Sequence, residues 1–375
     1  MFLFVLLWVY FAGFGSAHFI QDVSARNVVC YYMNSNYATL APPEKIDPKL
    51  CTHLNYAFVR IEETGNLTYQ SKYVDITQGV YKRVIALKKI NPSLKVLLSI
   101  GDTNASIFSK VAANETSRKN LVESSKHFLK TYSFDGLDVD WELPNATDRD
   151  NFIQILKDLR QEFDKENWIL TAAVYPNPSI GYNVPEMVKY LHMFNLMCYN
   201  YYGPWSAYTG QNSPLFASSI ESAYEKRNLN IAASVKNWID AGAPKEAINV
   251  GVPFYGKAFQ LADPKIHGLH APFIKAGSPV SPTFRQLPFF QLCSSKYSNW
   301  TRVWDDEQKN PYKYKGNQWI GYDDEKSIRK KAQYVVSQKL AGIMIWQIGQ
   351  DDVSGDCGEK QILLKIINEE LKQKP

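Results

Sequence analysis

Three carboxyl side chains stand at alternate positions in the segment FDGLDVDWELP, residues 134–144. They are Asp138, Asp140 and Glu142, and apolar residues occupy the positions between them. In a β-strand, side chains two residues apart share a face, so all three acids point the same way, with about 6.6 Å between successive Cα atoms. Carboxyl groups this close cannot all ionise cheaply, so at least one pKa must rise and a proton must be shared. A carboxyl group with a raised pKa is suited to general acid catalysis.

Two other interpretations of these acids are weaker. An exposed acidic strand would not place Leu137, Val139 and Trp141 at the alternate positions. A site for Mg²⁺ or Ca²⁺ would also use carboxylates, but no second acid cluster or pair of histidines is evident. We therefore expect acid catalysis without a metal or other cofactor.

Apolar, strand-like segments recur along the chain, mostly followed by helical patterns. We expect eight strands, at 27–33, 53–61, 95–101, 134–142, 168–176, 194–200, 248–256 and 342–349. Amphipathic patterns predict helices at 149–163 and 327–339, the first with Thr147 and Asp148 as N-cap candidates. Strands that alternate with helices predict a (β/α)8 TIM barrel, in which Glu142 would lie at the C-terminal mouth, where active sites form. A doubly wound sheet is the alternative, but no Gly-rich phosphate loop follows the first strand.

One interval is too long for a simple barrel. About 70 residues, rich in aromatic residues, Pro and Gly, separate the seventh strand from the helix at 327. They predict a small α+β insertion at about 260–325, between strand 7 and helix 7. Because no linker or internal repeat marks a second module, residues 18–375 are expected to form one domain that contains this insertion.

The N-terminal segment MFLFVLLWVYFAGFGSA, residues 1–17, is apolar and ends in small residues. It is typical of a secretory signal peptide cut before His18, although the usual Lys or Arg is missing. A membrane anchor is the alternative, but the run is short, and no later stretch is long and apolar enough to span a bilayer. We expect a secreted protein that is not bound to a membrane.

Charge, sequons and cysteines agree with an extracellular glycoprotein. The net charge of +5 is spread among acids, which argues against a nucleic-acid partner. N-x-S/T sequons predict glycosylation at five positions, Asn66, Asn104, Asn114, Asn145 and Asn299. An even subset of the five cysteines should pair in a secreted protein, although spacing does not give the connectivity. A monomer is expected.

The segment DGLDVDWE resembles the DxxDxDxE motif of family 18 glycoside hydrolases, which include chitinases and chitinase-like proteins. KVLLSIG, LMCYN, VPFYGKAF and GIMIW resemble the family's motifs on strands 3, 6, 7 and 8, so the resemblance covers nearly the whole mature chain. It implies retaining, substrate-assisted hydrolysis of β-1,4 bonds between N-acetylglucosamine units in chitin or its oligomers. The sugar's own 2-acetamido oxygen would attack C1 and form an oxazolinium ion.

The resemblance also implies residue roles. Glu142 would protonate the leaving oxygen and then activate water, Asp140 would orient the acetamido N–H, and Asp138 would share a proton with Asp140. The Tyr199 hydroxyl would hold the acetamido carbonyl. The sugar-binding residues would be Tyr31, Phe58, Met197, Asn200, Trp205, Tyr255 and Trp346, for which ordinary barrel core is the alternative. The implied disulfides are Cys30–Cys51 and Cys293–Cys357, with Cys198 free.

Several positions depart from the family pattern. They are Ser35, Asp102 with Thr103, Leu143, Asn200 and Lys257, which replace aromatic residues, Gly-Trp, Tyr, Asp and Arg respectively. We expect the chemistry to survive and the sugar groove to become thinner. The leading hypothesis is a secreted endo-type chitinase. The alternatives are a chitinase-like lectin or signalling protein that binds glycans with little or no turnover, and a hydrolase of N-glycan cores. The presence of Glu142 favours an enzyme.

Overall fold

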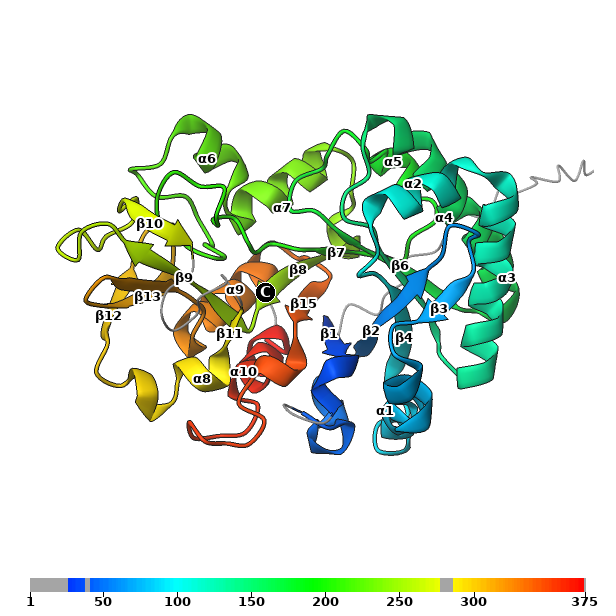
Figure 1. The fold of residues 1–375 in the computed structure, drawn as a ribbon, viewed down its shortest axis with the longest axis horizontal. Helices are drawn as coiled ribbons and strands as arrows, with labels where there is room; N and C mark the ends of the chain where they lie inside the picture. Colours follow the sequence, from blue (N-terminus) through cyan, green and yellow to red (C-terminus); the bar gives the residue numbers. More distant parts are fainter. Residues whose placement is uncertain (1–25, 38–40, 277–285, 374–375) are drawn as a thin grey trace, which may run out of the picture.

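The computed structural model describes residues 26–37, 41–276 and 286–373, so the predicted signal peptide lies outside the described residues. Eight parallel strands form a closed barrel (Figure 1). They are β1 (Asn27–Met33), β2 (His53–Ile61), β4 (Lys95–Ile100), β5 (Gly136–Asp140), β6 (Ile169–Val174), β7 (Met193–Leu196), β8 (Ile248–Pro253) and β15 (Gly342–Trp346). The barrel closes because β1 pairs with both β15 and β2. The short strand β3 (Leu67–Tyr69) extends β2 in antiparallel fashion. The predicted (β/α)8 barrel is confirmed.

Helices surround the barrel on its outer side (Figure 1). They are α1 (Val80–Ala86), α2 (Ala105–Ala113), α3 (Glu115–Tyr132), α4 (Arg149–Phe163), α5 (Val184–Met187), α6 (Ala223–Asn228), α7 (Ile231–Asp240), α9 (Glu325–Ser337) and α10 (Ile362–Leu371). The short helix α8 (Phe289–Leu292) lies instead against strands of the insertion. In the part of the chain that the structure describes, none of these helices is long and apolar enough to cross a membrane.

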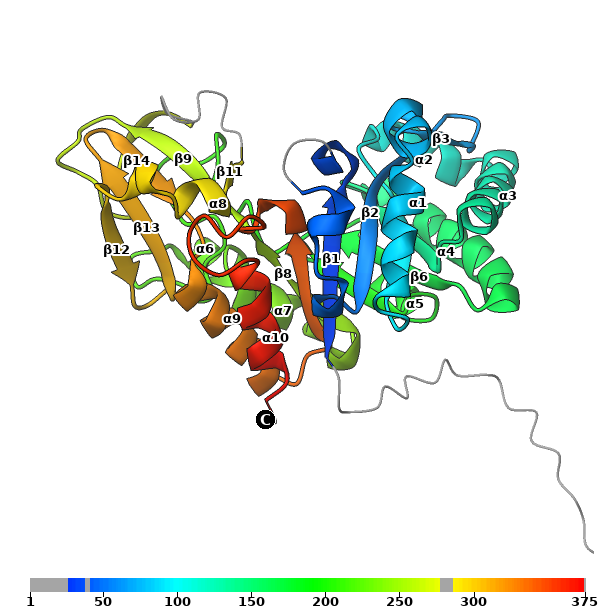
Figure 2. The same ribbon diagram turned by 90° about the horizontal axis from the view of Figure 1, so that it is seen from below.

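A second, antiparallel sheet lies to one side of the barrel in both views (Figures 1 and 2). Its strands are β9 (Tyr255–Leu261), β10 (Phe273–Ala276), β11 (Leu287–Pro288), β12 (Thr301–Asp305), β13 (Asn310–Lys315) and β14 (Gln318–Gly321). The sheet falls between the seventh barrel strand, β8, and the helix α9, so it fits the predicted insertion. The predicted strand at 248–256 was wrong in one respect, because residues from Tyr255 onward belong to this sheet.

Helix α4 shows how local sequence sets an element. Its apolar residues Phe152, Ile155 and Leu159 recur at helical spacing and are buried. Of the two predicted N-cap candidates, Asp148 occupies the N-cap position of α4, although its side chain makes no capping hydrogen bond to this helix. A 3₁₀ turn (Ala146–Asp148) precedes the helix, and the Asn145 side chain caps this turn by accepting a hydrogen bond from the backbone N–H of Thr147. Asp148 completes a capping box by accepting from the N–H of Asn145.

Two apolar layers meet at each barrel strand. Trp141, just after β5, is fully buried on the helix side, where it stacks on Phe108 of α2 and packs edge-on against Phe152 of α4. The lumen holds a separate cluster that includes Tyr31, Met344 and Trp346. Strand parity therefore sends the apolar neighbours of the acids outward and leaves the inner side for the acids themselves.

Candidate active site

Strand β5 carries Asp138 and Asp140 into the lumen, and Glu142 follows two residues later at the mouth of the barrel. The prediction that β5 runs from 134 to 142 was too long, because it spans Gly136–Asp140. Asp135 lies outside this row. It accepts hydrogen bonds from Lys88 Nζ at 2.7 Å and from the backbone N–H of Val96 at 2.8 Å, so it supports the strand from outside.

Four donors surround the innermost acid, Asp138, which is fully buried. The hydroxyls of Tyr31 and Ser99 donate to Oδ2 at 2.7 Å, the Thr171 hydroxyl donates to Oδ1 at 2.5 Å, and Asn195 Nδ2 donates to Oδ1 at 3.4 Å. Burial raises the pKa of Asp138, and the four donors oppose that rise. Because an ionised carboxylate is a pure acceptor, this ring of donors suits the charged form.

Asp140 has the opposite environment. It is buried, and its Oδ1 has no hydrogen-bond partner among the described residues. Burial raises its pKa well above the usual range, and the charges of Glu142 and Asp138 raise it further. Burial also raises the pKa of Glu142, although this residue opens to solvent at the cavity. All three acids therefore have raised pKa values, but only Asp138 has donors that oppose the rise, whereas burial and neighbouring charge act together on Asp140.

A small cavity of about 100 Å³ lies directly above the acids. Its lining consists of Tyr31, Asp140, Glu142, Ala173, Met197, Tyr199, Asn200, Tyr255, Gln286 and Trp346. Six of the predicted binding or catalytic residues thus meet at one place with two of the acids. Phe58 is not in this lining and stacks on Trp346, with ring centroids 5.7 Å apart. The sequence analysis missed Ala173 and Gln286.

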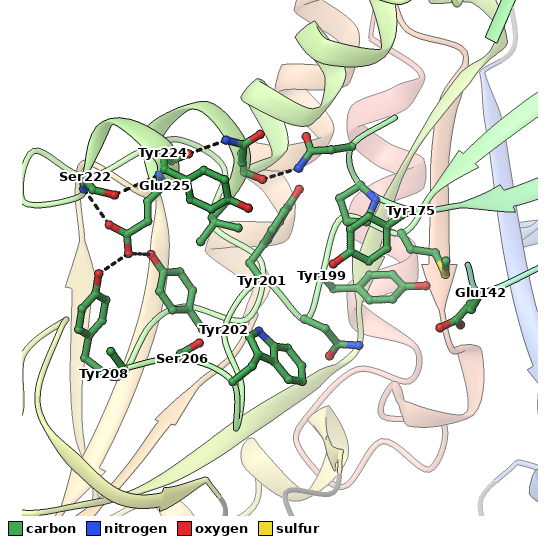
Figure 3. A pocket seen from close by; sticks show the side chains of 18 residues that line it. Glu142, Tyr175, Tyr199, Tyr201, Tyr202, Ser206, Tyr208, Ser222, Tyr224 and Glu225 are labelled. Carbon is green, nitrogen blue, oxygen red and sulfur yellow. Dashed lines mark hydrogen bonds between the residues drawn. The ribbon is translucent and has the colours of Figure 1, made fainter. Parts of the chain in front are cut away.

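A larger cavity of about 560 Å³ opens beside the small one and shares Glu142, Met197, Tyr199 and Asn200 with it (Figure 3). The remaining lining residues are Tyr175, Pro176, Asn177, Tyr201, Tyr202, Trp205, Ser206, Ala207, Tyr208, Ser222, Tyr224, Glu225, Asn228 and Leu229. Trp205, the predicted stacking residue, is 67% exposed here. Apart from Trp205, the sequence analysis missed these residues, although the tyrosine-rich run after β7 was a visible signal.

Polar contacts fix the boundary between the two cavities. The Tyr255 hydroxyl donates to Asn200 Oδ1 at 2.9 Å, and the backbone N–H of Asn200 donates to Asn212 Oδ1 at 3.1 Å. Asn200 has φ of +58°, a left-handed conformation that asparagine tolerates better than most residues. The Tyr199 hydroxyl contacts Met344 Sδ at 3.9 Å, a weak interaction that leaves it available to a ligand.

The unusual residues after β4 fold away from the lumen. Asp102 has φ of +48° and accepts hydrogen bonds from Arg60 at 2.5 Å and from Gln70 Nε2 at 2.8 Å. The Thr103 hydroxyl donates to the carbonyl of Gly101 at 3.1 Å. An ion pair and a hydroxyl turned back on the backbone therefore stand where the family pattern has a stacking tryptophan.

The other unusual positions have individual environments. Ser35 and Leu143 are exposed, the latter by 40%. Lys257 is buried with its ammonium 5.5 Å from the Tyr255 ring, and burial lowers the pKa of this lysine to about 8.

The cysteine pairing is confirmed. Cys30 pairs with Cys51 and Cys293 with Cys357, while Cys198 is buried and free. Burial raises the pKa of the Cys198 thiol to about 12, so it is no nucleophile at neutral pH. All five sequon asparagines are exposed, and their glycosylation stays a prediction. Within the described ranges, no group of three or more His, Cys, Asp or Glu side chains is arranged to hold a metal ion.

This chain resembles proteins of known class over most of its length. Residues 27–351 match the profile of glycosyl hydrolases family 18. The sequence is 33% identical to an endochitinase of Manduca sexta, over 94% of this chain and 68% of that protein. A crystal structure of Ostrinia furnacalis Group IV chitinase in complex with allosamidin matches with a TM-score of 0.86 and 36% identity, over 92% of this chain and 98% of that one. Human YKL-39, described as a pseudo-chitinase with retained chitooligosaccharide binding, matches with a TM-score of 0.85 and 32% identity, over 93% and 100%. The likeness thus includes both chitinases and a pseudo-chitinase.

Proposed function

Because the chain belongs to family 18 of the glycosyl hydrolases, we propose that it is a secreted endo-type chitinase that cleaves β-1,4 bonds between N-acetylglucosamine units with retention of configuration. The observation that carries this proposal is the position of Glu142. This acid has a raised pKa and lines both the small cavity above the acids and the larger cavity beside it.

In the first step, the protonated Glu142 donates its proton to the glycosidic oxygen. The bond from that oxygen to C1 breaks, and the carbonyl oxygen of the substrate's 2-acetamido group forms a bond to C1. The product of this step is an oxazolinium ion, which carries positive charge. The negative charge of the ionised Asp138, which lies behind Asp140 on β5, stabilises this positive charge electrostatically. The Tyr199 hydroxyl orients the acetamido carbonyl.

In the second step, the ionised Glu142 takes a proton from water. The water oxygen attacks C1 and opens the oxazolinium ring, which returns the acetamido group to its first state and leaves Glu142 protonated. Two displacements at C1 give overall retention. The aromatic lining of the lumen, Trp346 above all, provides the apolar surface on which the sugar rests.

The main alternative is a glycan-binding protein with little or no turnover. The likeness to YKL-39 and the missing tryptophan near Thr103 favour it. The complete set of Asp138, Asp140 and Glu142 favours the enzyme.

The deciding experiment is an assay of the purified protein on N-acetylglucosamine oligomers from tetramer to hexamer, with the anomeric form of the first products read by NMR. A chitinase of this mechanism releases the β-anomer first. Oligomers that bind but remain intact would establish the lectin alternative, and release of the α-anomer first would overturn the mechanism.

A further inference from the structure

The far end of the larger cavity carries an acid for which the proposed mechanism has no use. Glu225 lies on α6, which follows the tyrosine-rich loop, and it is only 6% exposed. Figure 3 shows Glu225 and Glu142 on opposite sides of the cavity, with Tyr201 and Tyr202 between them. A sugar chain that leaves Glu142 through this cavity would therefore run toward Glu225.

Hydrogen bonds hold the Glu225 carboxylate in its charged form. The hydroxyls of Tyr208 and Tyr202 donate to Oε1 at 2.7 and 3.0 Å, and the backbone N–H of Ser222 donates to Oε2 at 2.8 Å. Burial alone would raise the pKa of Glu225, but these bonds outweigh burial and lower it to about 2. Three donors do not exhaust the roughly four lone-pair sites of a carboxylate.

No cation compensates this charge within the protein. Across the described residues, no Lys or Arg forms an ion pair with Glu225. Its nearest basic group is His270, whose Nε2 lies 3.5 Å from Oε1. Burial lowers the pKa of His270, so the imidazole is neutral at neutral pH. The neighbouring acid Glu221 shares the Tyr202 hydroxyl and adds no positive charge. A buried carboxylate normally has a cationic partner.

The walls around this charge suit a sugar. Tyr224, one residue before Glu225, is 65% exposed, and Trp205 is 67% exposed. Both line the same cavity as Glu225, and Tyr175, which is 45% exposed, lies at the end of this cavity near Glu142 (Figure 3). Broad exposed aromatic rings beside a fixed anion offer an apolar face to a sugar ring and an acceptor to a positively charged substituent.

We propose that Glu225 is the anionic end of an aglycone subsite that binds the ammonium group of a glucosamine unit, so that the protein prefers partly deacetylated chitin chains. This inference rests on the proposed function for its substrate class. The N–H of an acetamido group can only donate a hydrogen bond to Glu225, whereas an ammonium group donates a hydrogen bond and also neutralises the charge of the carboxylate.

The competing explanation is that Glu225 is structural. It closes a capping box with Ser222 at the start of α6 and fixes Tyr202 and Tyr208. A structural role would alter the affinity for every oligomer alike. The ratio between a charged and a neutral oligomer of equal length therefore separates the two explanations.

The test uses hexamers of N-acetylglucosamine, either fully acetylated or with one glucosamine at successive positions in the reducing-end half. Binding is measured by calorimetry at pH 7 on the Glu142→Gln protein, which keeps the oligomers intact. We expect at least one glucosamine-bearing hexamer to bind about tenfold more tightly than the acetylated one, and 1 M salt to shrink that advantage.

The additional substitution Glu225→Gln should bring the ratio to about one, whereas Glu186→Gln, a control at a more exposed ion pair on α5, should leave it unchanged. Equal affinities in the Glu142→Gln protein would overturn the proposal, as would a ratio that survives Glu225→Gln. If the wild-type protein hydrolyses nothing but the ratio behaves as expected, the chitinase proposal fails while the glucosamine subsite stands.

Discussion

Glu142 lines both cavities, and the other acid in the lining of the larger cavity, Glu225, has a pKa lowered to about 2 and so holds no proton to donate at neutral pH. Substitution Glu142→Gln keeps the side-chain volume and replaces the acidic carboxyl group with an amide that cannot donate a proton to the leaving sugar. We expect kcat on the hexamer to fall by about 10² to 10⁴, the usual contribution of a general acid, while the dissociation constant for the hexamer changes little.

The matched control is Glu123→Gln, which changes an acid on the exposed face of α3 far from the barrel mouth. It should leave both kcat and the dissociation constant unchanged. Near-normal turnover by the Glu142→Gln protein would show that another group supplies the proton.

Asn200 also affects the pKa of Glu142, because it is neutral where the family pattern has an aspartate. It lies with Glu142 in the lining of both cavities and accepts the Tyr255 hydroxyl. Asn200→Asp keeps the shape and the acceptor but adds a negative charge, which disfavours ionisation of Glu142 and raises its pKa further. Because Glu142 must be protonated for the first step, activity is lost as pH rises through that pKa. The alkaline limb of kcat/KM should therefore move to higher pH.

The measurement is a full pH–rate profile of the wild-type and Asn200→Asp proteins on one soluble oligomer. A limb that stays in place or moves to lower pH would contradict this account of Asn200. A parallel profile of Asn167→Asp, which adds the same charge at an exposed surface position outside any sequon, controls for net charge.

At the scale of elements, helix α9 fixes the loop that builds the larger cavity. Lys331 on α9 is fully buried and forms an ion pair with Asp323, which lies just before the helix. Its ammonium also donates to the Ser213 hydroxyl at 3.1 Å, and Ser213 donates to the carbonyl of Cys198 at 2.7 Å. This buried network connects the segment that leads from the insertion into α9 with the residues just after β7.

Substitution Lys331→Met would leave the Asp323 carboxylate buried without its cation. Removing one partner of a buried pair typically lowers the free energy of unfolding by about 3–5 kcal/mol. The double substitution Lys331→Met with Asp323→Leu should recover most of that loss, because no charge is then left unpaired. Chemical denaturation of the three proteins tests this, and equal stabilities of the single and double variants would refute it.

Sequence periodicity predicts those strands and helices in which the pattern of apolar and polar residues lies within the element itself. The predicted ranges 53–61 and 149–163 coincide with β2 and α4, since each carries its burial pattern within itself. The row of acids likewise followed from strand parity. The split between β8 and β9 was missed because the apolar run continues through both, and only pairing with distant strands separates them.

The larger cavity illustrates the limit of such reasoning. Apart from Glu142, its lining comes from the loop after β6 and from the long segment between β7 and α7. Nothing in the sequence distinguishes Glu225 from the other acids of the chain. Only the fold brings it to the tyrosine hydroxyls and across the cavity from Glu142.

At the scale of the whole molecule, the two sides of the groove differ. One side offers the cavity of about 560 Å³ lined by tyrosines. Near the end of β4, the paired Asp102 and Arg60 and Thr103, whose hydroxyl donates to the backbone carbonyl of Gly101, replace an aromatic surface. The sequon at Asn104 follows directly, exposed at the start of α2. We propose that a glycan on Asn104 covers this arm of the groove, so that short or soluble chains are preferred over crystalline chitin.

Two substitutions can remove the glycan with different structural consequences. The Asn104 side chain caps α2 by accepting the backbone N–H of Ser106 at 2.9 Å. Asn104→Gln removes both sequon and cap and should lower the free energy of unfolding by about 1 kcal/mol. Ser106→Ala removes the sequon but keeps the cap, so stability should hold. Both should increase sugar release from insoluble chitin relative to cleavage of tetramer and hexamer. Efficient processive degradation of crystalline chitin by the fully glycosylated protein would disprove the proposed cover.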